Sequence, residues 1–204
     1  MILFLKTTFS YQSLILLIFI LPFNLNSQDN LKNSSALSKY KWRAIGPANM
    51  GGRVTDIDGI PGDKSVFYVS GADGGIFKTT NGGVNFKPIF EGQRAYSIGA
   101  LTISPSDSNV LWVGTGEGDP RNSVGYGWGV YRSVNGGENW DHLGLEKTER
   151  IKRIVVDPNN PDIACVCALG KEWGPNKERG VFKTTNGGKS WKKILYIDED
   201  TGCA

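Results

Sequence analysis

The stretch GGIFKTTNGGVNF, residues 74–86, has two further copies along the chain. They are GVYRSVNGGENW at residues 129–140 and GVFKTTNGGKSW at residues 180–191. In every copy an apolar run leads into Asn-Gly-Gly and ends on an aromatic residue. The amide of Asn can hydrogen-bond the backbone of its own turn, and glycine supplies the positive φ that a tight turn needs. The three stretches therefore predict three hairpin turns of one repeated unit.

Each turn closes a longer unit of similar layout. An apolar alternating run, a turn rich in Pro, Asn or Asp, a second run and a variable loop precede it, which predicts a four-stranded antiparallel meander. The units cover about residues 53–90, 97–145 and 150–195. A period of about 40 to 50 residues is typical of β-propeller blades. We therefore expect an all-β propeller over residues 41–204, incomplete in this chain, with three blades and the start of a fourth.

The hairpin turns resemble the Asp-box, or BNR repeat, in which Ser or Thr, Asp or Asn, Gly and Trp stand at fixed spacing. The chain departs from that pattern with Asn85, Asn139 and Phe86. The resemblance implies that the turn joins the third and fourth strands of a blade, and its aromatic ring should fill the space between sheets. We expect a structural role for Thr79, Asn81, Gly83, Phe86, Ser133, Asn135, Gly137, Trp140, Thr184, Asn186, Gly188 and Trp191.

Longer phrases support a narrower resemblance. GPANMGGRV at residues 46–54, GTGEGDPRNS at residues 114–123 and GVFKTTNGG at residues 180–188 look like the N-terminal blades of large bacterial exported proteins with sortilin-like propeller domains. Residues 1–27 have the pattern of a cleavable signal peptide, with Lys6 before an apolar run that ends at Phe23. An uncleaved anchor is the alternative, and residues 28–40 form a polar leader. We expect a secreted, periplasmic or cell-surface protein without a membrane span after cleavage.

Charge and cysteine content restrict the possible partners. The formal net charge is +3 with both signs interspersed, which argues against a nucleic-acid partner. Cys165 and Cys167 share one face of a strand and Cys203 has no visible partner, so we expect packed thiols and no disulfide. The single histidine, His142, is remote from the cysteines in sequence, so we expect neither a metal nor a cofactor. The oligomeric state stays open.

Ligand binding is expected on one face of the blades. In a meander the variable loop lies at the opposite end from the hairpin turn, on the same face as the links between blades. Two insertions, residues 119–128 and 171–180, mix aromatic and charged residues. Aromatic rings can stack on sugars or peptide side chains, and arginine can bind carboxylates or hydroxyls. The candidate ligand-binding residues are Arg53, Arg121, Tyr126, Trp128, Arg150, Trp173 and Arg179.

Two carboxylates, Asp73 and Glu117, follow the second runs of neighbouring units and are candidate catalytic residues. Glycoside hydrolysis requires two such groups at a defined separation. Asp73 in the string ADGG also resembles the catalytic base of propeller glycosidases that act on xyloglucan, in which the acid comes from a second propeller. Arg53 and Arg150 fall at matching positions before the first runs of the first and third units. A sialidase would use three such arginines, but the second unit has Ser97 at this position. The alternative is that both carboxylates solvate a turn or bond backbone amides.

Three functions remain open from the sequence. The first is an extracellular binding scaffold for a peptide or polysaccharide. The second is a glycoside hydrolase, xyloglucanase-like or sialidase-like, with Asp73 as one carboxylate and its partner outside this sequence. The third is a structural role in an exported assembly. Because one fold can support all three, the sequence leaves open whether the protein is an enzyme.

Overall fold

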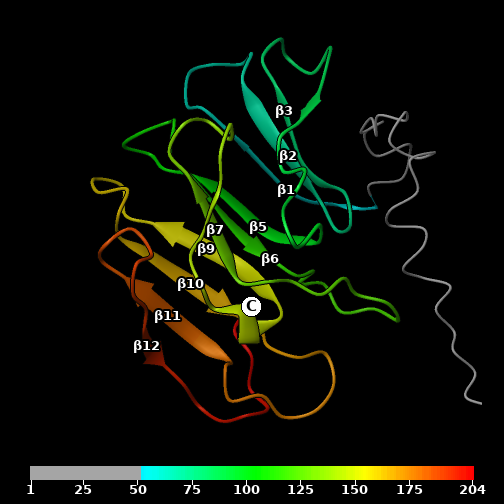
Figure 1. Cartoon of the computed structure of the whole chain (residues 1–204), viewed down its shortest axis with the longest axis vertical. Coiled ribbons are helices and arrows are strands. Elements are labelled where there is room, and N and C mark those ends of the chain that lie inside the picture. The colour runs from blue at the N-terminus through cyan, green and yellow to red at the C-terminus, as the bar shows by residue number, and fades with distance from the viewer. Residues whose placement is uncertain (1–51) are drawn as a thin grey trace, which may run out of the picture. The chain divides into compact units, whose positions relative to one another are not determined.

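The computed structural model describes residues 52–204, which form three four-stranded antiparallel sheets (Figure 1). The signal peptide and polar leader expected in residues 1–40 lie outside the described residues. Blade 1 contains β1 (Val54–Gly59), β2 (Phe67–Gly71), β3 (Gly75–Thr79) and β4 (Lys87–Pro88). Blade 2 contains β5 (Ile98–Ile103), β6 (Leu111–Thr115), β7 (Val130–Ser133) and β8 (Asp141–His142). Blade 3 contains β9 (Ile151–Val156), β10 (Ala164–Ala168), β11 (Gly180–Thr184) and β12 (Lys192–Leu195).

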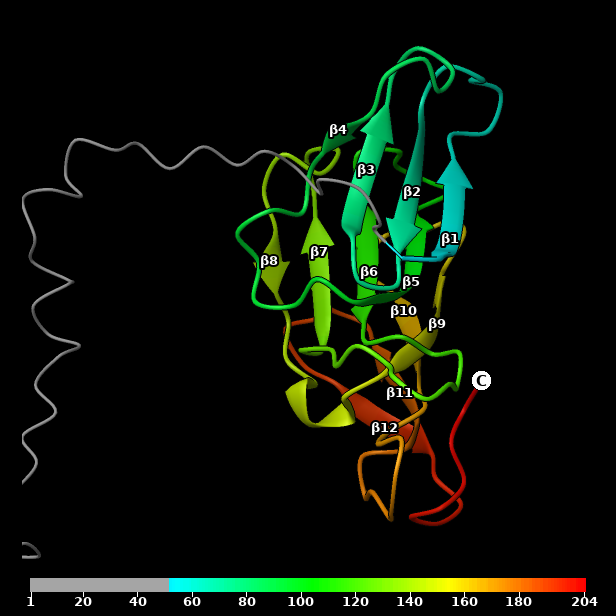
Figure 2. The ribbon, with the colours of Figure 1, turned by 90° about the vertical axis from the view of Figure 1, so that its right-hand side faces the viewer.

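The strands of each blade pair in sequence order, so each blade is the expected meander (Figure 2). Within the described residues the only helical segment is a 3-10 turn at Glu146–Thr148. None of the helical segments in residues 52–204 is long and apolar enough to cross a membrane.

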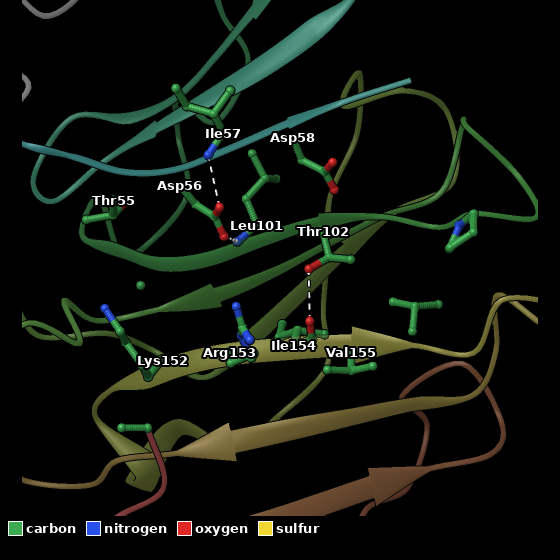
Figure 3. Close-up of a pocket in the computed structure, with 14 residues that line it drawn as sticks. Thr55, Asp56, Ile57, Asp58, Leu101, Thr102, Lys152, Arg153, Ile154 and Val155 are labelled. Carbon is green, nitrogen blue, oxygen red and sulfur yellow. Dashed lines mark hydrogen bonds between the residues drawn. The ribbon is translucent and has the colours of Figure 1, made fainter. Parts of the chain in front are cut away.

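The first strands of the blades, β1, β5 and β9, lie side by side (Figure 3). Asp56 on β1 accepts a hydrogen bond from the Leu101 amide on β5 at 3.0 Å. Thr102 on β5 donates to the Ile154 carbonyl on β9 at 3.0 Å. Side chains thus replace backbone ladder bonds between blades. The three strands line a cavity of about 630 Å³.

Apolar cores fill the space between neighbouring blades, and the aromatic residues of the hairpin turns complete them. The indole of Trp140 in blade 2 donates to the Ile89 carbonyl in blade 1 at 2.7 Å. Trp191 in blade 3 donates to the Leu143 carbonyl in blade 2 at the same distance. Phe86, which has no such donor, is 46% exposed. The rings of Trp140 and Trp191 are partly buried and pack against the cores between neighbouring blades, whereas Phe86 does not.

The cysteine expectation was wrong. Cys167 on β10 forms a disulfide with Cys203, and the two Cα atoms are 5.2 Å apart. Sequence spacing could not reveal this because the segment after β12 returns to the C-terminal end of β10, where the Cys203 amide bonds the Ala168 carbonyl. Cys165 is the remaining free thiol of the described residues.

Candidate functional site

Backbone contacts divide each blade into two ends, as expected. The Asn-Gly-Gly turns pack on the turns between first and second strands, since the Gly82 amide bonds the Ser65 carbonyl and Gly136 bonds Asn109. At the other end the variable loops meet the links between blades, where the Gly116 amide bonds the Ser97 carbonyl at 2.7 Å. We call this second end the loop face.

The turns at the opposite end use their polar atoms internally. The hydroxyl of Thr79 accepts hydrogen bonds from the amides of Asn81 and Gly83, and the side chain of Asn81 accepts one from the Asn85 amide. Ser133 with Asn135 and Thr184 with Asn186 repeat these bonds. The turns therefore stabilise their own hairpins and present no obvious binding chemistry.

Asp73 lies exposed on the loop face, in the turn after β2. It lines a cavity of about 290 Å³ with Tyr96 and Glu91. The blade 2 insertion approaches it from the other side, because a side chain at Gly125 would overlap the carboxylate of Asp73 and the hydroxyl of Ser97. The Ser97 hydroxyl donates to the Gly125 carbonyl at 3.1 Å. Asp73 is thus accessible between a link and an insertion loop.

Glu117 is near this carboxylate but fully buried, with a side chain that is 0% exposed. Its carboxylate contacts the guanidinium of Arg53, and the Arg53 side chain as a whole is 41% exposed. The Glu117 amide bonds the Gly125 carbonyl, and the Arg53 carbonyl accepts from the Ala72 amide at 2.8 Å. The ion pair therefore joins blades 1 and 2 immediately beside Asp73. Burial of a carboxylate is tolerated because the guanidinium compensates its charge.

Arg150 is in an equivalent place before β9, but it is buried. It contacts Glu172, and the side chains are 4% and 10% exposed. Its other donors bond the carbonyls of Gly170 and Lys171 at 2.7 and 2.9 Å. Burial, and secondarily the positive charge of Arg179, lowers the pKa of Arg150.

Arg179 supports the same insertion loop. Its guanidinium donates to four carbonyls, those of Leu169, Lys171, Gly174 and Glu199. Arg150 and Arg179 are therefore brought together, but their donors hold the backbone of blade 3. In this arrangement neither guanidinium has its donors free for a ligand.

Exposed aromatic rings gather on the loop face. Among residues 52–204, five aromatic side chains are exposed. Tyr96, Tyr126, Trp173 and Tyr196 belong to links or insertions of the loop face, and only Phe86 is at the opposite end. Tyr126 is 65% exposed and Trp173 is 77% exposed.

Trp128 is different from the other candidate aromatics, because the guanidinium of Arg94 lies 3.6 Å from its ring centroid. One face of this indole is therefore covered by a cation–π contact. Trp128 and Tyr126 line a cavity of about 600 Å³ between the insertions of blades 2 and 3, which also includes Glu149 and Lys171. Arg121 is exposed in the blade 2 insertion.

The ligand-binding residues predicted from the sequence do not include Arg94 and Tyr96. Both residues are in the link between blades 1 and 2. The meander pattern assigns this link to the loop face, so the position of the link was the sequence signal for these two residues. Within residues 52–204 no group of three or more His, Cys, Asp or Glu side chains is arranged to hold a metal ion.

Comparisons with known proteins identify the fold. No family model and no curated protein matches the chain. An ancestral GH74 enzyme is 22% identical, with 74% of this chain and 19% of that chain covered and a TM-score of 0.55. The GH74 xyloglucanase from Xanthomonas campestris is 20% identical, with 76% and 22% covered and a TM-score of 0.52.

A structure of YCF48 bound to D1 peptide is also similar, at 15% identity, 71% and 40% coverage and a TM-score of 0.50. The chain spans about a fifth of the length of the GH74 structures that it matches. These similarities, together with three successive four-stranded blades, show that residues 52–204 adopt a β-propeller fold.

Proposed function

We propose that this chain belongs to a secreted β-propeller that binds a glycan or peptide on its loop face. The carrying observation is that exposed Tyr96, which lines a cavity with Asp73, and the exposed rings of Tyr126 and Trp173 all belong to links or insertions of the loop face. Exposed aromatic rings provide stacking area for a sugar or peptide, and the charged groups provide directional hydrogen bonds. The Asp-box-like turns and the sortilin-like phrases of the sequence support the same assignment.

Glycoside hydrolysis is the second candidate, and the exposure of Asp73 favours it. Asp73 follows β2 in the string ADGG and is accessible to a ligand on the loop face. Glu117 is enclosed and paired with Arg53, so it is poorly placed to serve as the second carboxylate. In this alternative the acid comes from outside residues 52–204, as the resemblance of ADGG to the xyloglucan-acting propellers implies. The similarity to a GH74 xyloglucanase is compatible with this role, and the YCF48 complex is compatible with peptide binding.

The first experiment is a glycan and peptide array with the full-length protein, combined with an assay for released sugar. A Tyr126→Ala, Trp173→Ala variant should bind at least tenfold more weakly, because it removes two stacking surfaces. Phe86→Ala is the matched control, since this exposed ring lies at the opposite end of the blades. Equal loss in the control, or no loss in the double variant, contradicts binding on the loop face.

An Asp73→Asn variant separates the two candidates. Sugar release that disappears in this variant while binding persists supports hydrolysis. Binding without release in the wild type supports a recognition scaffold. No binding to any array member by the folded protein contradicts the proposed function itself.

A further inference from the structure

The full burial of Glu117 requires an explanation. Neither carboxylate oxygen accepts a hydrogen bond from another described group, so the contact with Arg53 is its compensation. A buried carboxylate with so few partners is costly for the fold. The Glu117 carboxylate does, however, fix the position of the Arg53 guanidinium.

The contact with Glu117 occupies only some of the N–H donors of Arg53. Guanidinium carries five N–H donors, and within residues 52–204 the Arg53 side chain makes no further hydrogen bond. Its side chain is 41% exposed, so a ligand on the loop face can approach it. The neighbouring backbone is close to Asp73, because a side chain at Gly52 would have its Cβ 3.5 Å from the Asp73 amide nitrogen.

The charges at this point decide which ligand group fits. Glu117 cancels the charge of Arg53, and Asp73 adds an exposed negative charge beside the pair. From these three side chains an anionic group would meet two negative charges and one positive charge. A hydroxyl group fits better, because it can accept from Arg53 and donate to Asp73.

We propose that Glu117 is a positioning residue, which holds Arg53 as a charge-neutralised donor for an uncharged, hydroxyl-bearing ligand such as a neutral glycan. The inference rests on the proposed function of the loop face and adds the chemical class of its ligand. It gives Glu117 a role through Arg53 without contact with the ligand.

The charge cancellation can be tested without a known ligand, with inorganic sulfate as the probe. Glu117→Gln keeps the size of the side chain and leaves the positive charge of Arg53 uncancelled. We expect this variant to bind sulfate about tenfold more tightly than the wild type in a calorimetric titration. The Arg53→Gln, Glu117→Gln double variant should lose the gain, which assigns it to Arg53.

Glu172→Gln is the matched control, because it leaves Arg150 unpaired in a buried place and should gain no sulfate binding. Wild-type binding as tight as that of Glu117→Gln, a gain that survives in the double variant, or an equal gain in the control overturns the proposal. Should Glu117→Gln fail to fold, Asp73→Asn gives the answer. Asp73→Asn keeps the Arg53–Glu117 pair and should bind sulfate less than threefold more tightly than the wild type. Tenfold tighter binding would show that Glu117 does not cancel the charge of Arg53.

Oligosaccharides then test the ligand class. The wild type should prefer neutral cello- and xylo-oligosaccharides to galacturonate oligosaccharides, and Glu117→Gln should shift this preference about tenfold toward the acidic set. Preference of the wild type for the acidic set, or for peptides, overturns the inference but leaves the proposed binding function intact. Absence of all binding contradicts the proposed function, while the sulfate titration still decides the role of Glu117.

Discussion

Arg53 and Arg150 stand directly before β1 and β9, and each contacts a glutamate, yet the two ion pairs differ in reach and exposure. The Arg53 pair reaches across from blade 1 to blade 2 and leaves the Arg53 side chain 41% exposed. The Arg150 pair stays inside blade 3, with only 4% of its side chain exposed. Equivalent positions in a repeat can therefore carry one residue type for different purposes.

The difference follows from the loop that each arginine meets. The blade 3 insertion folds back over its own first strand, so the carbonyls of Gly170 and Lys171 occupy the donors of Arg150. The turn after β2 in blade 1 is short and offers Arg53 no such carbonyls. In these two blades, loop length thus decides whether the arginine before the first strand supports the fold or remains accessible to a ligand.

Replacement of each arginine by alanine should change the unfolding free energy most and should separate the two ion pairs most clearly. Arg150→Ala leaves Glu172 buried without its partner and two carbonyls without donors, so we expect a loss of about 3 to 5 kcal/mol in unfolding free energy. Arg53→Ala should cost about 1 to 2 kcal/mol, because water can reach the vacated place. Urea unfolding of the full-length variants measures both values. Equal losses would show that exposure does not distinguish the pairs.

The disulfide should be the next largest contribution, and it belongs to the buried region of blade 3. Cys167→Ser opens a loop with a sequence separation of 36, which predicts a loss of about 3 to 4 kcal/mol from chain entropy. Cys165→Ser is the matched control, since this thiol is free and on the same strand. The control should cost about 1 kcal/mol or less. Similar unfolding midpoints for both variants under oxidising conditions would contradict a structural bridge.

The sequence was sufficient to predict the blades but not the contacts of the candidate site. The blades follow from local signals, namely Asn-Gly-Gly turns and alternating apolar runs, so the meander could be predicted. The burial of Glu117, the use of Arg179 by four carbonyls and the partner of Cys167 depend on contacts between segments distant in sequence. Repeat alignment placed Arg53 and Arg150 at equivalent positions, but it could not show which one is enclosed.

Replacement of each arginine by lysine tests the same difference while the positive charge is retained. Arg150→Lys retains the charge but cannot reproduce the forked bonds to Gly170, Lys171 and Glu172, so we expect a loss of about 2 kcal/mol. Arg53→Lys retains one contact with Glu117 and should cost less than about 1 kcal/mol. Its effect should appear in ligand affinity, because lysine presents its donors from a different point. Thermal unfolding and array binding of the two variants give both readouts.

The smallest effect on stability is expected at the exposed rings of the loop face. Tyr126→Ala and Trp173→Ala should each change the unfolding free energy by about 0.5 kcal/mol or less, because these side chains are 65% and 77% exposed. Each should nevertheless weaken ligand binding by about 1 to 3 kcal/mol if its ring stacks on the ligand. Trp191→Ala provides the opposite pattern, since its indole donates to the Leu143 carbonyl between blades and its loss should destabilise the fold. A destabilised Trp173→Ala variant with unchanged affinity would assign this ring to loop packing, and the loop face would then depend on Tyr96 and Tyr126 alone.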